Sequence, residues 1–126
     1  MTVITVIGLG EAGRLYATGL ASAGATVRGY DPFLNIDDDA FEQFETLEAA
    51  LDGCDVALSL VGARAAEPVA RQVAEAAGSP LVFADLNTAS PEVKLAVGEA
   101  AAAGGLVPCD AAVMAPVPRA GHRTPL

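Results

Sequence analysis

Residues 2–13 read TVITVIGLGEAG, and this stretch decides the fold. Its first part, Thr2–Ile7, is an almost continuous run of β-branched residues, which is typical of a strand buried on both faces of a parallel sheet. The helical stretch Glu11–Ala23 follows, and the pattern G-x-G-x-x-G spans the turn between them at residues 8–13. In this strand–turn–helix context the pattern predicts a binding site for the pyrophosphate of a dinucleotide.

Each glycine of the turn has its own physical task. Gly8 permits the tight turn out of the strand, Gly10 lets a pyrophosphate approach the backbone, and Gly13 lets the helix pack closely on the strand. The unpaired N–H groups at the start of the helix carry about half a positive charge and favour an anion there. The predicted loop is completed by Leu9, Glu11 and Ala12. The alternative interpretation is a glycine-rich turn that binds no ligand.

Asp31 follows the second predicted strand, Thr26–Tyr30. A carboxylate at this position can accept both hydroxyls of the adenosine ribose and would repel a 2′-phosphate, so it favours NAD over NADP, which stays the alternative cofactor. Asp31 would otherwise only cap the turn before Pro32. The three aspartates at 37–39 indicate a solvated acidic loop, and no spacing along the chain predicts a metal site.

Strands and helices alternate along the rest of the chain. Further strands are expected at Val56–Val61, Leu81–Ala84 and Leu106–Ala112, with a short strand or turn at Phe41–Phe44. Helices are expected at Thr46–Asp52 and Ala63–Ala77, and from a Ser90 cap and Pro91 to Ala103. This repetition implies parallel strands joined by crossover helices. We therefore predict an α/β fold, a doubly wound, mostly parallel Rossmann-type sheet of about six strands flanked by helices.

Composition narrows the class of protein. The chain has 126 residues, which is one domain, and a net charge of −9, which argues against nucleic acid or an anionic membrane as a partner. The apolar fraction of 52% excludes disorder, yet no apolar run reaches the roughly 18 residues of a membrane helix. No signal peptide is recognisable, so a cytoplasmic location is expected. Cys54 and Cys109 lie in apolar surroundings and are interpreted as buried free thiols.

Ligands of doubly wound sheets bind at the carboxyl ends of the strands, which draws attention to the residues that follow them. Val61 and Gly62 end one strand, and small residues there leave room for a cofactor. Asn87 and Thr88 follow the next strand and offer an amide and a hydroxyl to a nicotinamide or a substrate. The alternative is that these two are ordinary turn and cap residues.

Four segments, in this order and spacing, resemble a known family: VIGLGEAG (6–13), YDP (30–32), DLNTASPEV (85–93) and DAAVMAPV (110–117). They resemble the NAD-binding domain of the β-hydroxyacid dehydrogenases, which include 3-hydroxyisobutyrate, tartronate-semialdehyde and 6-phosphogluconate dehydrogenases. The likeness covers essentially the whole chain and is strongest to a 6-phosphogluconate-dehydrogenase-like branch of NAD-binding oxidoreductases. It implies NAD(P)-dependent oxidation of the CH–OH group of a small 3-hydroxy acid, or the reverse reduction.

The resemblance also implies roles for individual residues. It implies that the pyrophosphate lies on Gly8–Gly13, that Asp31 holds the ribose, and that Val61 and Gly62 line the cleft. The residues it places beside the nicotinamide and the substrate are Asn87, Thr88, Val113, Met114 and Ala115. Family members hold a substrate carboxylate with a Ser-Gly-Gly sequence. Because this chain has Met114, Ala115 and Pro116 there, the exact substrate does not follow from the likeness.

The catalytic lysine of the family stands on a later helix, in a second, helical domain. The one lysine here, Lys94, does not match that motif and is interpreted as a surface residue, and His122 has no partner motif. We therefore expect a dinucleotide-binding domain at residues 1–112 and a proline-containing tail, 113–126, leading toward a missing C-terminal helical domain. Such a chain is expected to be inactive alone and to form a homo-oligomer through uncovered apolar surface. The alternative is a non-catalytic NAD-binding module that senses redox state or acts as a scaffold.

Overall fold

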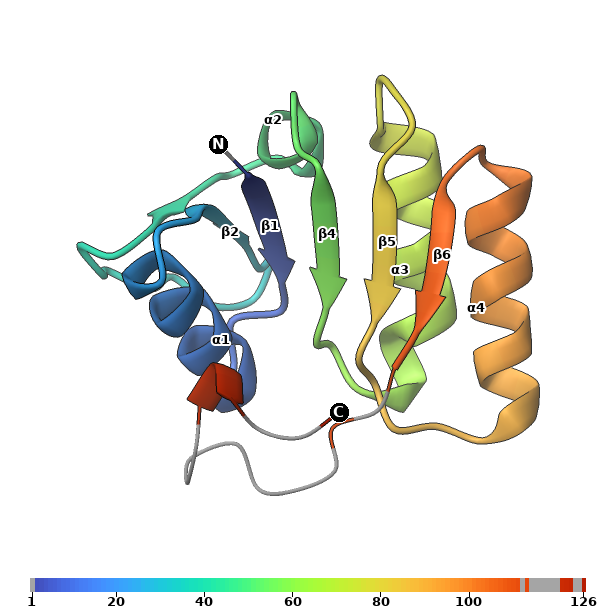
Figure 1. The fold of residues 1–126 in the computed structure, drawn as a ribbon. Coiled ribbons are helices and arrows are strands. Elements are labelled where there is room, and N and C mark those ends of the chain that lie inside the picture. The colour runs from blue at the N-terminus through green and yellow to red at the C-terminus, as the bar shows by residue number, and fades with distance from the viewer. Residues whose placement is uncertain (1, 112, 114–120, 124–125) are drawn as a thin grey trace.

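The computed structural model describes residues 2–111, 113, 121–123 and 126, and the six strands in this part of the chain form a single sheet (Figure 1). The strands are β1 (Val3–Ile7), β2 (Thr26–Tyr30), β3 (Glu42–Gln43), β4 (Val56–Ser59), β5 (Val82–Asp85) and β6 (Val107–Asp110). The helices are α1 (Glu11–Ser22), α2 (Leu47–Leu51), α3 (Ala63–Ala76), α4 (Pro91–Ala103) and a 3₁₀ turn, η1 (Gly121–Arg123). The strand order is β3-β2-β1-β4-β5-β6, and every neighbouring pair is parallel. The predicted doubly wound, Rossmann-type α/β fold is confirmed.

The order of the strands reverses between β1 and β4. In a doubly wound sheet this reversal leaves a crevice beyond the carboxyl ends of the strands, because the connections on its two sides run in opposite directions. The turn after β1 starts at Gly8, and the loop after β4 starts at Leu60. The Leu60 N–H donates to the Ile7 carbonyl at 2.9 Å, so the two loops lie side by side at this point.

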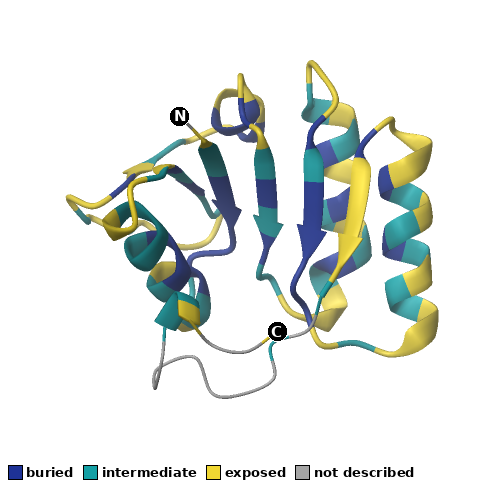
Figure 2. Ribbon diagram, viewed as in Figure 1, coloured by how far each residue is buried: buried dark blue, intermediate teal, exposed yellow. Residues whose placement is uncertain are grey.

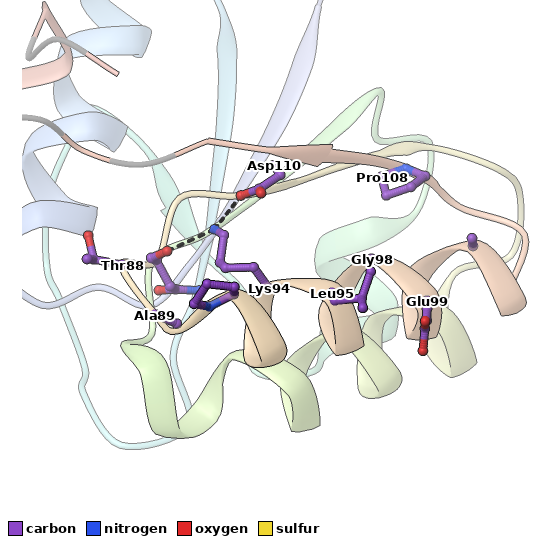
Figure 3. Close-up of a pocket in the computed structure, with 11 residues that line it drawn as sticks. Thr88, Ala89, Lys94, Leu95, Gly98, Glu99, Pro108 and Asp110 are labelled. Carbon is purple, nitrogen blue, oxygen red and sulfur yellow. Dashed lines mark hydrogen bonds and ion pairs between the residues drawn. The ribbon is translucent and has the colours of Figure 1, made fainter.

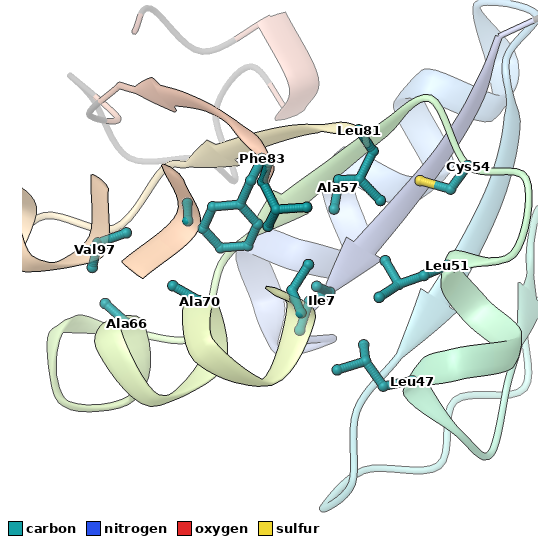
Figure 4. Close-up of a cluster of buried hydrophobic side chains, with 13 residues drawn as sticks. Ile7, Leu47, Leu51, Cys54, Ala57, Ala66, Ala70, Leu81, Phe83 and Val97 are labelled. Carbon is teal, nitrogen blue, oxygen red and sulfur yellow. The ribbon is translucent and has the colours of Figure 1, made fainter. Parts of the chain in front are cut away.

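The sheet has a large core on one face, formed against α2, α3 and α4. Ile7, Ala57 and Phe83 project from neighbouring strands into it, and Figure 4 shows Phe83 among the helix residues Ala66, Ala70 and Val97. Alanine lets the helices lie close to the strands: Ala66, Ala70 and Ala101 are completely buried. The opposite face carries a smaller core under α1, because alternate strand residues point the other way. Its buried members are Val6, Leu9, Ala17, Val27 and Phe41.

The predicted Ser90 cap is confirmed, because its Oγ accepts a hydrogen bond from the Val93 N–H at 3.3 Å. Thr46, which was expected inside the short helix, lies before α2 and caps it by accepting from the Ala49 N–H at 3.2 Å. Strand ends were predicted less well: β4 ends at Ser59, so Val61 belongs to the following loop. The predicted strand was two residues too long at this end because Leu60 and Val61 are as apolar as the residues of the strand itself.

The edge strand β6 differs from the buried strands, and Figure 2 shows it exposed along its length. The prediction that Cys109 is buried is wrong, whereas Cys54 is buried as predicted. Cys109 pairs with Ala84 in register and therefore points to the α1 face, where α1 packs on β1 and β2 instead. Pro108 also lacks an N–H to offer, which weakens the free edge as a template for a further strand.

Candidate functional site

The turn between β1 and α1 has room for glycine alone at two positions. Gly8 has a φ of +94°, and a Cβ there would lie 2.3 Å from the Leu60 carbonyl oxygen. A Cβ on Gly13 would lie 1.7 Å from the Gly8 carbonyl oxygen, so this residue lets α1 start directly against the turn. Gly10 is different: nothing lies within 4 Å of the space its Cβ would occupy. The turn is closed toward the protein and open at Gly10.

Asp31 joins this turn to the end of β2. One carboxylate oxygen accepts from the Leu9 N–H at 2.8 Å, and the other accepts from the N–H groups of Phe33 at 2.8 Å and Leu34 at 3.1 Å. Asp31 therefore does cap the turn that contains Pro32. A carboxylate has about four acceptor directions, so this bonding leaves capacity for a hydroxyl.

A cavity of about 520 Å³ lies beside the turn and Asp31, bordered by Gly8 and Gly10. Its walls come from the segment after β2 and from α3, and they are mostly apolar: Pro32, Phe33, Leu34, Val61, Ala65, Pro68 and Val69. None of the described residues that line it carries a positive charge. Its volume is within the range of small-molecule sites, which is about 300–1,000 Å³.

The start of α1 is suited to an anion. Its first residue is preceded by Gly10, and no side chain caps the first turn among the described residues. The N–H groups there are consequently open to a negatively charged group. Arg28, the nearest cation in sequence to Asp31, is engaged elsewhere: its guanidinium donates to carbonyls at the end of α2 and stacks over the Phe44 ring at 5.3 Å.

The side chain of Asn87 is fully engaged inside the protein. Its Oδ1 accepts from the N–H groups of Val61 at 2.9 Å and Gly62 at 2.8 Å. Its Nδ2 donates to the Asp85 carboxylate at 2.7 Å and to the Ser59 hydroxyl at 3.1 Å. Asn87 is only 4% exposed and ties the loop after β4 to the end of β5. It thus shapes the wall at Val61 rather than presenting a free amide.

Lys94 is not the surface residue that the sequence suggested. Its side chain is 12% exposed and forms ion pairs with Asp85 at 3.0 Å and Asp110 at 2.7 Å. Burial by itself lowers the pKa of Lys94, but the two carboxylates outweigh it and raise the pKa above the usual 10.5. The prediction failed because a lone lysine on an Ala-rich helix shows no sign of the two carboxylates, which come from separate strands.

Ser59, Asp85, Asn87, Lys94 and Asp110 form what we call the strand-end network. Ser59 pairs in register with Asp85, and Asp85 with Asp110, so these three lie on one face at the carboxyl ends of β4, β5 and β6. Figure 3 shows Lys94 reaching Asp110 across an open groove along α4 and β6. Of these residues, only Asn87 was assigned a site role from the sequence.

The remaining predicted site residues are placed as follows. Thr88 is exposed next to the strand-end network, and Val113 is half-buried. Met114 and Ala115 lie outside the described residues. His122 packs on α1, where a Cβ on Gly19 would lie 2.0 Å from its Nδ1. Tyr16 in α1 was not singled out by sequence: it is 3% exposed, its hydroxyl has no partner among the described residues, and burial raises its phenol pKa.

The family model for the NAD binding domain of 6-phosphogluconate dehydrogenase matches residues 3–124. The chain belongs to this family. It is an NAD-binding domain of the hydroxyacid-dehydrogenase type. Its open Gly10 turn lies at the switch point of the sheet, where the strand order reverses between β1 and β4, and Asp31 is hydrogen-bonded to that turn. No helix in the described part of this domain has the length and apolarity to cross a membrane.

Solved structures with the same fold include a conserved hypothetical protein from Sinorhizobium meliloti 1021, with a TM-score of 0.87 and 33% identity over 99% of this chain. A 3-hydroxyisobutyrate dehydrogenase from Mycobacterium tuberculosis with L-serine has a TM-score of 0.87 and 28% identity over 96% of this chain. An imine reductase variant from Myxococcus stipitatus in complex with NAD+ shares the fold, with a TM-score of 0.77 and 19% identity over 91% of the chain. The domain spans 46%, 43% and 42% of those three chains, respectively. A comparison with curated proteins found no match.

Proposed function

We propose that this domain supplies the cofactor site of an oxidoreductase that acts on the CH–OH group of a small 3-hydroxy acid, with NAD as the hydride acceptor. The supporting observation is the cavity of about 520 Å³ that joins Gly10, Asp31 and α3 at the switch point. The Mycobacterium tuberculosis neighbour is a 3-hydroxyisobutyrate dehydrogenase solved with L-serine, and both named molecules are 3-hydroxy acids. That likeness supports the substrate class.

In this proposal the pyrophosphate lies on residues 8–13 at the start of α1, where the dipole and open N–H groups favour it. The adenosine half enters the apolar cavity, and the remaining acceptor capacity of Asp31 takes a ribose hydroxyl. The acidic Asp31 and the lack of a cation among the described residues of the cavity wall disfavour a 2′-phosphate, which supports NAD over NADP.

The substrate side is proposed at Thr88 and Val113, with Met114 and Ala115 following. Hydride transfer also requires a general acid–base group, and the raised pKa of Lys94 makes this lysine a poor base at neutral pH. We therefore propose that the domain, residues 1–112, binds NAD but does not turn over substrate without a further, helical domain. Both cysteines are free thiols, which supports a cytoplasmic location.

The test of the site is calorimetric titration of the chain with NAD+ and NADP+, compared with Gly10→Asp. Asp fits at position 10 because its Cβ meets open space, but its charge would repel the phosphates. The matched control is Gly78→Asp, which also meets open space and does not line the cavity. We expect NAD+ affinity to fall at least about tenfold in the first variant alone. Equal binding by Gly10→Asp and wild type would refute the pyrophosphate assignment.

Asp31→Ala tests the ribose assignment and cofactor choice. Its control is Asp55→Ala, because Asp55 also accepts from a backbone N–H, that of Val3 at 2.8 Å, but at the start of β1. We expect both variants to lose stability and only Asp31→Ala to lose NAD+ affinity, with a smaller preference over NADP+. A preference for NAD+ that is unchanged in Asp31→Ala would exclude this role. An assay of NADH formation from 3-hydroxy acids should give no turnover by the chain alone.

We also propose that the domain self-associates. Leu95 and Val107 are 65% and 56% exposed, respectively, on the α4–β6 side of the sheet. Apolar side chains of this size favour association when several are uncovered. Light scattering coupled to size-exclusion chromatography should show a dimer or larger species, and a monomer at all concentrations would contradict the proposal.

A further inference from the structure

The ammonium of Lys94 is surrounded by five oxygen atoms from three segments of the chain. It donates to the carbonyls of Asp85 at 3.1 Å, Asn87 at 2.8 Å and Ala111 at 3.0 Å. It also pairs with the carboxylates of Asp85 and Asp110 at 3.0 and 2.7 Å. A side chain with three donors is thereby shared between the ends of β5 and β6 and the loop at residues 86–88.

The two carboxylates require this cation. Asp85 and Asp110 are register partners on adjacent parallel strands, so two like charges project from the same face. Asp85 is only 3% exposed and water cannot screen it. Without the ammonium, Asp85 would be an uncompensated buried charge. Its side chain would then move toward water, or its carboxylate would take up a proton.

Asp85 in turn orients Asn87. One Asp85 oxygen accepts from both the backbone N–H of Asn87 at 3.0 Å and its Nδ2 at 2.7 Å. Because the amide nitrogen is fixed in this direction, the amide oxygen faces the loop after β4. There it receives the N–H groups of Val61 and Gly62, and Val61 forms part of the cavity wall.

We propose that Lys94 is a positioning residue for the dinucleotide, acting through Asp85 and Asn87 to hold the Val61–Gly62 loop in the shape that receives the cofactor. The inference rests on the proposed function, because it takes NAD to occupy the cavity bordered by Val61. Lys94 does not border that cavity, so its effect on the cofactor passes through this continuous series of hydrogen bonds.

The experiment compares Lys94→Met with Val97→Ala in the same helix. Met keeps the length of the side chain but removes the charge and all three donors. Val97 is 2% exposed and packs into the core, so its truncation lowers stability while every hydrogen-bonding group and charge of the network remains. NAD+ affinity is measured by calorimetry, and the exchange rates of the Val61 and Gly62 amide hydrogens are measured by NMR spectroscopy.

We expect Lys94→Met to weaken NAD+ binding about tenfold and to speed exchange at Val61 and Gly62 by a similar factor. Val97→Ala should melt at a lower temperature yet keep wild-type affinity and wild-type exchange at these two amides. If Lys94→Met does not fold, Asp110→Asn serves instead, because Asp110 is 68% exposed and its loss removes one ion pair only. That variant should show the same two changes at a smaller size.

Three results overturn the inference. The first is that folded Lys94→Met, or Asp110→Asn if that variant is used instead, binds NAD+ with wild-type affinity. The second is that Val97→Ala loses as much NAD+ affinity as Lys94→Met, which would mean that Lys94 contributes only to the general stability of the domain. The third is that the amide hydrogens of Val61 and Gly62 exchange at the wild-type rate in Lys94→Met. Absence of NAD+ binding by the wild-type chain would instead overturn the proposed function, and this inference with it, so the two failures are distinguishable.

Discussion

Two regions at the carboxyl edge of the sheet are built in different ways. The shape of the turn at residues 8–13 is set by its backbone, with glycines where a Cβ would collide and an opening at Gly10. The strand-end network is made by side chains, five of them from β4, β5, β6, α4 and the loop before α4. The first is a local device within one short segment, and the second exists only after three strands have come together.

The difference concerns how each region responds to change. The shape of the turn depends on glycines that leave no room for a Cβ at Gly8 and Gly13, so it fails when an atom is added there. A network of buried polar groups fails when any one member is removed, because its partners are then left buried and unpaired. Substitutions in the two regions should therefore have separable consequences.

The largest effect is expected from Gly13→Ala, which adds one carbon to the turn. The new Cβ would lie 1.7 Å from the Gly8 carbonyl oxygen, a backbone atom that can yield only by moving α1 or β1. We expect a loss of about 3 kcal/mol or more in the free energy of unfolding, measured in urea. The control is Gly98→Ala in α4, where the Cβ meets open space and stability should rise by about 0.5–1 kcal/mol. Equal stabilities of the two variants would contradict this account of the turn.

The next largest effect is expected from Asn87→Ala, which removes the centre of the network. The N–H groups of Val61 and Gly62 would lose their acceptor, and Asp85 would lose the Nδ2 donor. The backbone donor of residue 87 remains, so the expected loss is about 2–3 kcal/mol. Urea unfolding measures the loss in the free energy of unfolding. A loss smaller than that of an exposed substitution such as Leu95→Ala would show that the network is not needed for stability.

High pH should loosen the network and leave the turn intact. Lys94 has a raised pKa, so its ion pairs contribute fully below 10.5, the unfolded value, and are lost as pH rises through the higher folded value. Buried Tyr16 acts in the same direction. Its phenol ionises near pH 10.0 in the unfolded chain, but burial raises its pKa in the folded protein, so ionisation favours unfolding. Melting temperature should fall above about pH 10, more steeply in wild type than in Lys94→Met. Identical slopes would mean that Lys94 titrates normally.

The smallest effect is expected from Tyr16→Phe, in a residue that belongs to neither region. Its hydroxyl is buried without a partner among the described residues, so removing it should leave stability unchanged or raise it by up to about 1 kcal/mol. Thr5→Val is the contrast, because the buried Thr5 hydroxyl donates to the Ala50 carbonyl and its loss should cost about 1 kcal/mol. The melting temperatures of both variants test this prediction. A clear loss of stability in Tyr16→Phe would show that the phenol has a hydrogen-bond partner.

Much of the fold was predictable from sequence because its signals are local. The β-branched run before Gly8, the Ser90 cap with Pro91, and the strand at Thr26–Tyr30 all depend on neighbouring residues. The strand order was not fixed by these signals. The exposure of Cys109 depends on its strand lying at the edge of the sheet and on α1 packing elsewhere.

The sequence by itself determined the glycine turn, the acid after the second strand and the family, since each is written in a few consecutive residues. Only the tertiary structure decided the role of Lys94 and the full engagement of Asn87. Their partners Ser59, Asp85 and Asp110 are distant in sequence and meet because parallel strands bring their carboxyl ends to one edge. Burial then gives the hydrogen bonds and charges a strength that isolated residues in water do not have.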